Sequence, residues 1–351
     1  MTQAGNPGSG KLMILEKIKK FKKTSITLAI FALILILIFI LSRGPAHSRE
    51  DMKYGITFSN FHAQDLGLDW KEAYLEILDE LEIEKLRLAA YWNEVEENKG
   101  EFNFKDLDWQ IKEASKRDVD IILGVGYRLP RWPECHFPDW AEDMEREKRQ
   151  PLILEYIEKT VLRYKDNPNI KAWQVENEPF LSSYFGECPR LDKDFLDQEI
   201  ELVKSLDSRP VIVTDSGELS LWVPAARRGD IFGTTMYKKT YSGQLNMYVN
   251  YPIGPWFFHL KRNVTNWFAD PEKWIVIELQ GEPWGERPYQ KLSLEEREKT
   301  MCPDKLVDMV DLARKSGFKE LYLWGAEYWY WKKTKNNNPE MWEQAKKLFT
   351  Q

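Results

Sequence analysis

Two kinds of apolar pattern alternate along residues 50–351. Short continuous apolar runs are typical of strands that are covered on both faces, and the segments between them have the one-sided pattern of amphipathic helices. The predicted strands are 54–59, 85–90, 120–125, 170–176, 211–214, 231–236, 274–278 and 320–324. The predicted helices are 70–81, 106–117, 151–164, 193–206, 219–228, 255–268, 294–316 and 339–349.

Eight successive strand–helix units predict an α/β protein with a (β/α)8 TIM barrel over residues 53–351. An open doubly wound sheet is the alternative, but that fold often has a glycine-rich turn after its first strand, and residues 60–62 read Asn-Phe-His. We expect Pro151, Pro255 and Pro339 in first helical turns, and Gly317 at the end of a helix.

A different pattern occupies the N-terminus. Residues 24–42 carry no charge and would span about 28 Å as a helix, close to the hydrocarbon thickness of a bilayer. This length predicts a transmembrane signal anchor with the lipid bilayer as its partner. The alternative is a cleavable signal peptide, but Ser-Arg-Gly-Pro at 42–45 is a poor cleavage site.

The charge distribution orients this predicted anchor. The whole chain has a net charge of −6 and residues 1–23 have +5, so the remainder is −11. Basic residues before a span favour a cytoplasmic N-terminus, which leaves residues 43–52 as a linker and the barrel outside the cell membrane in a single-pass topology. An acidic barrel repels phosphate backbones, so we expect no nucleic-acid partner.

Composition also narrows the chemistry. Three Cys and four His form no recognisable metal-binding motif, so we predict a site without a metal or cofactor. Cys135 and Cys188 both follow predicted strands and could pair, or both could remain thiols. The chain holds 15 Trp, and large flat rings with one polar atom suit a sugar-binding cleft as well as a core.

Polar and aromatic residues cluster where the predicted strands end, which is where TIM barrels hold their active sites. Glu178 follows the fourth strand and Glu278 ends the seventh. Two carboxyl groups across a barrel mouth can flank a glycosidic bond, one protonated and one ionised, without a metal. The other candidates at strand ends are Arg87, Trp132, Asn177, Tyr237 and Trp324.

Three segments carry a resemblance to a known group. WQVENEPF at 173–180, the stretch 86–126 and ELQGEPW at 278–284 occur in an order that resembles the retaining glycoside hydrolases of clan A. The resemblance implies that Glu178 is the acid/base and Glu278 the nucleophile. Retention further predicts carboxyl groups about 5–5.5 Å apart. Cellulase-like members of family 5 have His-x-Tyr after the sixth strand, but this chain has Thr235 in the His position, and galactosidase-like relatives remain an alternative.

The same resemblance suggests roles for the neighbouring residues. Arg87 would keep Glu278 ionised, and the Tyr237 hydroxyl would orient that carboxylate. Asn177 would bond the sugar 2-hydroxyl. Trp324 would form a stacking floor for the sugar, and Trp132 would stand in a long loop, 126–150, that walls the cleft.

Other interpretations stay open at this stage. Glu282 rivals Glu278 as the nucleophile, although it lies in a Gly-Glu-Pro turn, and a loop positions a carboxylate less rigidly than a strand end. Glu176 suits a supporting group in the barrel interior. The leading hypothesis is a membrane-anchored enzyme acting on an oligo- or polysaccharide. The alternatives are an inactive glycan-binding barrel and a purely structural envelope protein.

Overall fold

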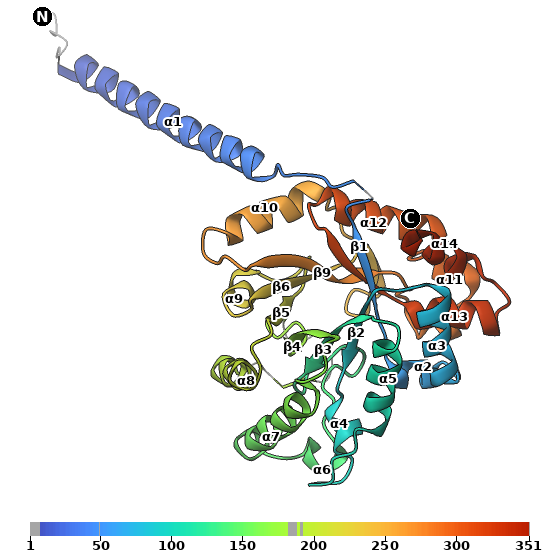
Figure 1. Ribbon diagram of the computed structural model, residues 1–351. Coiled ribbons are helices and arrows are strands. Elements are labelled where there is room, and N and C mark those ends of the chain that lie inside the picture. Colours follow the sequence, from blue (N-terminus) through green and yellow to red (C-terminus); the bar gives the residue numbers. More distant parts are fainter. Residues whose placement is uncertain (1–7, 49, 182–187, 190–191, 351) are drawn as a thin grey trace, which may run out of the picture.

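The computed structural model describes residues 8–48, 50–181, 188–189 and 192–350, with side chains from Lys20 onward. Its main body is a closed barrel of parallel strands surrounded by helices, with one long helix projecting from it (Figure 1). The barrel order is β1-β10-β9-β6-β5-β4-β3-β2. The barrel strands are β1 (Lys53–Thr57), β2 (Lys85–Ala89), β3 (Asp120–Val125), β4 (Ile170–Val175), β5 (Val211–Asp215), β6 (Ile231–Met236), β9 (Lys273–Gln280) and β10 (Glu320–Trp324).

The strand prediction is confirmed. All eight predicted strands are present, and pairing of β1 with β10 closes the barrel, so the doubly wound alternative is wrong. The helices of the described residues are α1 (Gly8–Leu41), α2 (Asn60–Asp65), α3 (Trp70–Glu80), α4 (Trp92–Val95), α5 (Lys105–Ser115), α6 (Asp139–Glu142), α7 (Arg146–Tyr164), α8 (Lys193–Leu206), α9 (Val223–Ala226), α10 (Pro255–Thr265), α11 (Leu294–Glu298), α12 (Pro303–Lys315), α13 (Ala326–Lys335) and α14 (Glu340–Phe349), with one 3-10 turn at Tyr289–Lys291.

Several helix predictions need correction. The predicted helix 294–316 is two helices, because Pro303 has no backbone N–H to continue the first and instead starts α12. Pro151 lies inside α7, which begins earlier than predicted, and Pro339 is the N-cap of α14. Pro255 does stand in the first turn of α10, and Gly317, with φ of +82°, does follow α12.

Two elements have no counterpart in the prediction. Helix α13 follows β10 directly, and its aromatic side chains are buried. The antiparallel hairpin β7 (Lys239–Ser242) and β8 (Met247–Asn250) follows the carboxyl end of β6. Both elements add to the end of the barrel where the strands finish, which is the face that holds the candidate site.

Two apolar layers hold the barrel together. A small cluster fills the barrel interior, and a much larger cluster lies between the strands and the surrounding helices. The interior cluster consists of Ile122, Ala172, Ile212, Ile275, Ile277 and Tyr322. Side chains alternate between the two faces of a strand. The interior positions in β3, β4, β5, β9 and β10 therefore identify which other residues of these strands point inward.

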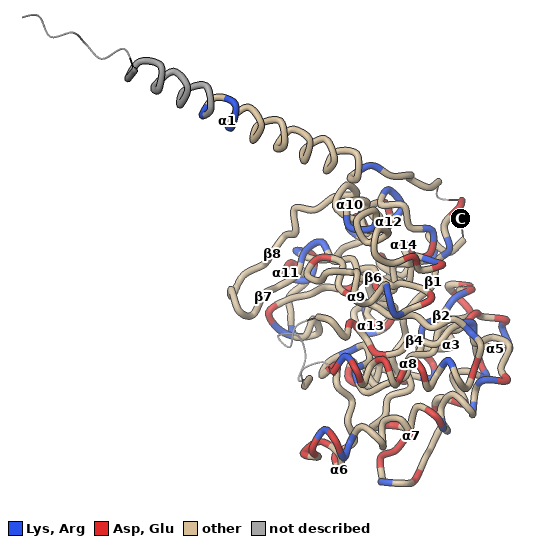
Figure 2. The backbone as a smooth tube through the Cα atoms, turned by 90° about the vertical axis from the view of Figure 1, so that its left-hand side faces the viewer, with Lys and Arg blue, Asp and Glu red and all other residues tan. Residues whose placement is uncertain are grey.

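Helix α1 contains the predicted span. Its residues Lys20–Leu41 form a segment long and apolar enough to cross a membrane, and an 18-residue window within it has a mean hydropathy of 2.9. This segment is exposed, and Figure 2 shows that it carries no charged residue between the lysines and the end of the helix. The helix begins at Gly8, so it extends well ahead of the predicted start at residue 24. A membrane anchor and a signal sequence both fit these properties.

Candidate active site

Alternation within the strands brings Arg87 and Tyr237 into the barrel. In β2, Leu86 and Leu88 join the outer apolar layer, so Arg87 between them points inward. In β6, Phe232 and Met236 point outward in the same way, and Tyr237 continues the inward series just past the strand. Arg87 is almost fully buried, whereas Tyr237 keeps part of its surface open at the mouth.

Glu278 reaches the interior through an irregularity in β9. Ile275 and Ile277 point inward, so strict alternation would turn Glu278 outward. The register of β9 shifts against both neighbours over this stretch, as at a β-bulge. A bulge changes the direction of the side chains that follow it. Here two consecutive residues, Ile277 and Glu278, both point into the barrel.

Arg87 organises the centre of the site. Its Nη1 donates to Glu278 Oε1 at 2.8 Å, and its Nη2 donates to Asn177 Oδ1 at 2.7 Å. Its Nε donates to Gln174 Oε1 at 2.7 Å. A buried ion pair is tolerated only when its polar atoms find partners, and this guanidinium uses all three of its nitrogens. The Glu278 carboxyl group is therefore held beside a permanent cation.

Tyr237 supplies the second contact to Glu278. Its hydroxyl donates to Glu278 Oε2 at 3.1 Å. Burial, and then the charge of Glu278, raise the pKa of Tyr237 well above its usual value, so this hydroxyl keeps its proton. With Arg87 on Oε1 and Tyr237 on Oε2, both oxygens of the carboxylate are fixed.

Glu178 has a different environment. It follows β4 with φ of +44°, and its backbone N–H donates to Thr214 Oγ1 at 2.8 Å. Its carboxyl group accepts from the Thr235 hydroxyl at 3.1 Å, and no salt bridge to it is found among the described residues. Burial, followed by the charges of Glu278 and Glu134, raises the pKa of Glu178 well above its usual value. This carboxyl group therefore favours its protonated form.

Glu134 is a third carboxyl group in the same place, and sequence reasoning missed it. It accepts from Asn177 Nδ2 at 3.5 Å. Burial is the main cause that raises the pKa of Glu134 to about 7, and the charge of Glu278 adds to it. Glu134 lies in the long loop after β3, where no strand periodicity predicts the direction of a side chain.

A braced loop holds Glu134 in position. Glu176 is buried, as expected, and accepts from the backbone N–H groups of Tyr127 and Arg128 at 2.9 and 2.7 Å. Gly126, with φ of +115°, permits this approach, because a Cβ there would lie 2.3 Å from the Glu176 carboxyl group. A disulfide joins the residue after Glu134, Cys135, to Cys188, with 5.4 Å between their Cα atoms.

The remaining predicted residues lie around this centre. Trp324 is buried at the end of β10, and its Nε1 donates to Glu282 Oε1 at 2.8 Å. The guanidinium of Arg131 covers the Trp324 ring at 4.0 Å and contacts Glu282 at 2.5 Å. Glu282, the rival nucleophile, is thus engaged by Arg131 and Trp324. Trp132 is 64% exposed, so its ring lies at the surface.

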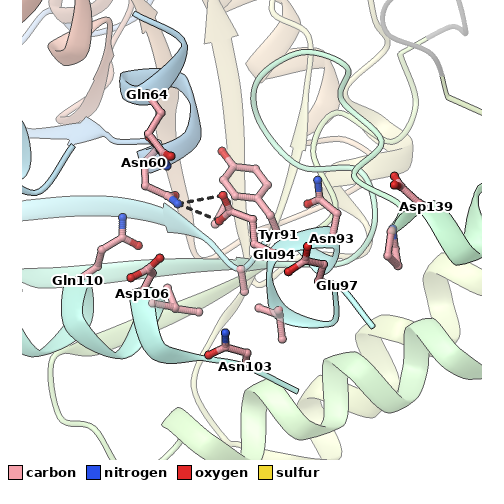
Figure 3. Close-up of a pocket in the computed structure, with 15 residues that line it drawn as sticks. Asn60, Gln64, Tyr91, Asn93, Glu94, Glu97, Asn103, Asp106, Gln110 and Asp139 are labelled. Carbon is pink, nitrogen blue, oxygen red and sulfur yellow. Dashed lines mark hydrogen bonds between the residues drawn. The ribbon is translucent and has the colours of Figure 1, made fainter. Parts of the chain in front are cut away.

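A separate polar hollow is lined by residues of α2, α4, α5 and the segments near them (Figure 3). It has a volume of about 470 Å³, and five amide and four carboxyl side chains line it. Glu94 accepts there from Asn60 Nδ2 at 3.0 and 2.9 Å, and burial raises the pKa of Glu94. None of the predicted site residues lines this hollow. Tyr91 stands at its wall with its hydroxyl already bonded to Ser59 and to the Pro130 carbonyl.

Comparison with known proteins shows which enzymes this chain resembles. A family model described as Beta-galactosidase (Glyco_hydro_42) matches residues 68–210. The β-galactosidase LacZ of Lactobacillus acidophilus is 23% identical over 222 residues, which are 57% of this chain and 33% of that protein. In sequence and fold the chain is similar to the glycoside hydrolases of clan A. It spans about a third of the length of the curated β-galactosidases it matches.

Solved structures agree on the fold. Xylanase 10B from Thermotoga maritima superimposes with a TM-score of 0.57 at 16% identity, covering 86% of this chain and 96% of that one. GH5_18 from Streptomyces cattleya, solved in complex with GlcNAc, gives a TM-score of 0.53 at 13% identity, covering 80% and 71%. At such low identity these likenesses concern the barrel alone.

Proposed function

We propose that this chain is a retaining glycoside hydrolase that cleaves β-linked glycans by double displacement. The observation that carries the proposal is the contrast between two carboxyl groups at one barrel mouth. Glu278 is an anion fixed at both oxygens by Arg87 and Tyr237, whereas Glu178 accepts from a neutral hydroxyl and has a raised pKa. Environments that separate two carboxyl groups in this way assign them to opposite roles.

In the first step, the Glu278 carboxylate attacks the anomeric carbon while Glu178 protonates the departing glycosidic oxygen. A covalent glycosyl–enzyme forms and the aglycone leaves. In the second step, Glu178, now ionised, takes a proton from water, which attacks the same carbon and releases Glu278. Each glutamate ends as it began, so the cycle needs no cofactor.

The surrounding residues position the substrate and the nucleophile. Arg87 donates to Asn177 Oδ1, and Asn177 Nδ2 donates one of its two hydrogens to Glu134. We propose that its other hydrogen is donated to the sugar 2-hydroxyl. Trp324 offers the sugar the ring face that Arg131 does not cover. Trp132 is placed to meet a more distant sugar unit at the rim of the cleft.

The substrate class can be tested directly. Because relatives of this chain are β-galactosidases, aryl β-galactosides are the first substrates to assay, followed by β-mannosides, β-xylosides and a glycan array. Retention predicts that proton NMR during turnover first detects the β-anomer of the product. Initial release of the α-anomer would rule out double displacement. Glycan binding without turnover would identify an inactive binding barrel, and neither binding nor turnover would leave a structural role.

We further propose that residues 24–42 anchor the enzyme in the cell membrane. Residues 1–23 are then cytoplasmic, residues 43–52 are the linker, and the barrel at 53–351 lies outside. A reporter fused to the C-terminus should be active only on the outer side of the membrane. Recovery of a mature protein that begins near residue 45 would show instead that the segment is a cleaved signal peptide.

A further inference from the structure

The linker after α1 is packed against the barrel. Asn263 of α10 donates from Nδ2 to the carbonyls of Leu41 and Arg43 at 2.8 and 3.2 Å. Gly44 lies so close to His259 that a Cβ there would be 2.1 Å from the ring, a space that only glycine fits. The end of α1 is therefore held at a defined place on α10.

Further contacts show which face of the barrel this is. Arg314, near the end of α12, donates to the His47 carbonyl at 2.6 Å, and the His47 ring contacts the Gly317 carbonyl at 3.1 Å. Gly317 precedes β10, so the linker packs at the N-terminal ends of the strands. Figure 1 agrees, because α1 joins where β1 begins, whereas α4 and α6, which follow the carboxyl ends of β2 and β3, lie at the opposite end.

Two large aromatic side chains lie exposed beside this junction. Trp267 and Phe268 form the turn after α10 and are 57% and 52% exposed. They come about one helical turn after Asn263, which is the residue that holds the end of α1. The exposed Arg227 donates from Nε to the Phe268 carbonyl at 2.9 Å and places a cation beside the pair.

The geometry sets how far this pair is from a bilayer. If residues 24–42 span the hydrocarbon, Leu41 lies at its outer boundary. The headgroup layer beyond that boundary is roughly 5–8 Å deep on each side. One helical turn is about 5.4 Å, so residues just past Asn263 lie within reach of this layer. Trp is enriched at this depth because its ring is apolar and its N–H is polar.

We propose that Trp267 and Phe268 rest in the headgroup layer of the outer leaflet, so that the barrel stands on the bilayer by its N-terminal face. This inference rests on the membrane anchor proposed above and adds a second point of contact. The exposed acids Asp270 and Glu272 follow the pair and limit it to shallow contact. The catalytic cleft then opens away from the membrane, toward glycans of the surroundings and not toward headgroups of the same bilayer.

Spin labelling of the full chain in nanodiscs of phosphatidylethanolamine and phosphatidylglycerol tests this proposal. Cys302→Ser removes the free thiol, because Cys135 and Cys188 are joined. Single labels are then placed by Leu33→Cys in α1, by Asn266→Cys beside the aromatic pair, and by Leu245→Cys in the exposed β7–β8 hairpin. Collision with oxygen and with a nickel chelate reports the depth of each label.

We expect the label at 33 to be in hydrocarbon, the label at 266 to be at headgroup depth and the label at 245 to be in water. The pair Trp267→Gln and Phe268→Gln should at least double the nickel accessibility at 266 and leave position 33 unchanged. The matched pair Leu245→Gln and Met247→Gln, also exposed and apolar, should change neither label.

Two failures are distinguishable. A label at 266 as open to nickel as one at 245, while position 33 stays in hydrocarbon, overturns the contact surface but keeps the anchor. A label at 33 in water overturns the anchor, and the contact surface with it. Neither result bears on the chemistry of the cleft, which activity on aryl glycosides reports separately.

Discussion

The two glutamates at the barrel mouth have the same side chain but different surroundings. Glu278 sits on a strand, its charge balanced by a guanidinium and its oxygens held by two donors. Glu178 sits after a strand, on backbone with positive φ, and its carboxyl group accepts from the hydroxyl of Thr235. The proposed division of roles therefore rests on the partners of each carboxyl group, more than on its position in the barrel.

The largest effect should come from Glu278→Ala. Loss of the attacking carboxylate removes the covalent step, so kcat should fall by about ten-thousand-fold or more on every β-glycoside. Added azide or formate should restore part of the activity by attacking from the vacated side. If Glu282→Ala is the inactive variant and Glu278→Ala is not, the nucleophile is Glu282.

Glu178→Ala should have an effect that depends on the leaving group. Loss of a general acid costs about 10²–10⁴-fold where the departing oxygen needs a proton. A dinitrophenyl glycoside, whose phenolate leaves without protonation, should still form the glycosyl–enzyme. Azide should then release that intermediate as a β-glycosyl azide. Equal losses on activated and natural substrates would contradict the division of roles between the two glutamates.

The barrel could be predicted from sequence because its strands are buried on both faces. Their continuous apolar runs are visible without any knowledge of contacts, and strand ends such as Arg87 and Tyr237 follow from them. The β7–β8 hairpin was missed because it lies at the surface, where its side chains are mostly half-buried or exposed. Pro303 was the visible signal that the helix predicted at 294–316 is two.

The site was only partly predictable for a different reason. Glu278 was found because it ends an apolar run, yet it faces the barrel interior only through a register shift that no single-chain pattern reveals. Glu134 depends on loop geometry with φ of +73° and on the Cys135–Cys188 disulfide, which sequence left undecided. Periodicity describes regular backbone, and these features arise where the backbone is irregular.

Tyr237→Phe should have a smaller effect than either glutamate variant. It removes one hydrogen bond to the Glu278 carboxylate, and bonds to charged groups contribute about 1.5–3 kcal/mol. That range corresponds to a roughly 10–100-fold loss of kcat, with little change in KM if the bond orients the nucleophile and not the substrate. An equal rise in KM would show that the hydroxyl contacts the sugar. Thermal unfolding of the variant controls for a damaged barrel.

The smallest effect, and the finest test of the contrast, should come from Glu134→Gln. The groups that set the pKa of Glu178 besides burial are Glu278, Glu134 and Asp215, which raise it, and Arg128, which lowers it. In the proposed mechanism Glu178 acts in its protonated form, so activity should fall as pH rises through its pKa. Removal of the Glu134 charge lowers that pKa, so the alkaline limb of kcat/KM should move to lower pH. The rate at the optimum should change less than about tenfold, because no bond to the reacting atoms is removed.

The pKa of Glu134 itself restricts where this shift can be seen. At about 7, Glu134 is neutral below that pH and affects Glu178 electrostatically only above it. The acidic limb should therefore be the same in both enzymes. Glu94→Gln is the matched control, since it replaces a carboxyl group with raised pKa in the separate hollow and should leave both limbs in place. If the alkaline limb stays at the same pH in Glu134→Gln, the charge of Glu134 has no measurable effect on the pKa of Glu178. Burial and the other neighbouring charges would then account for the raised pKa.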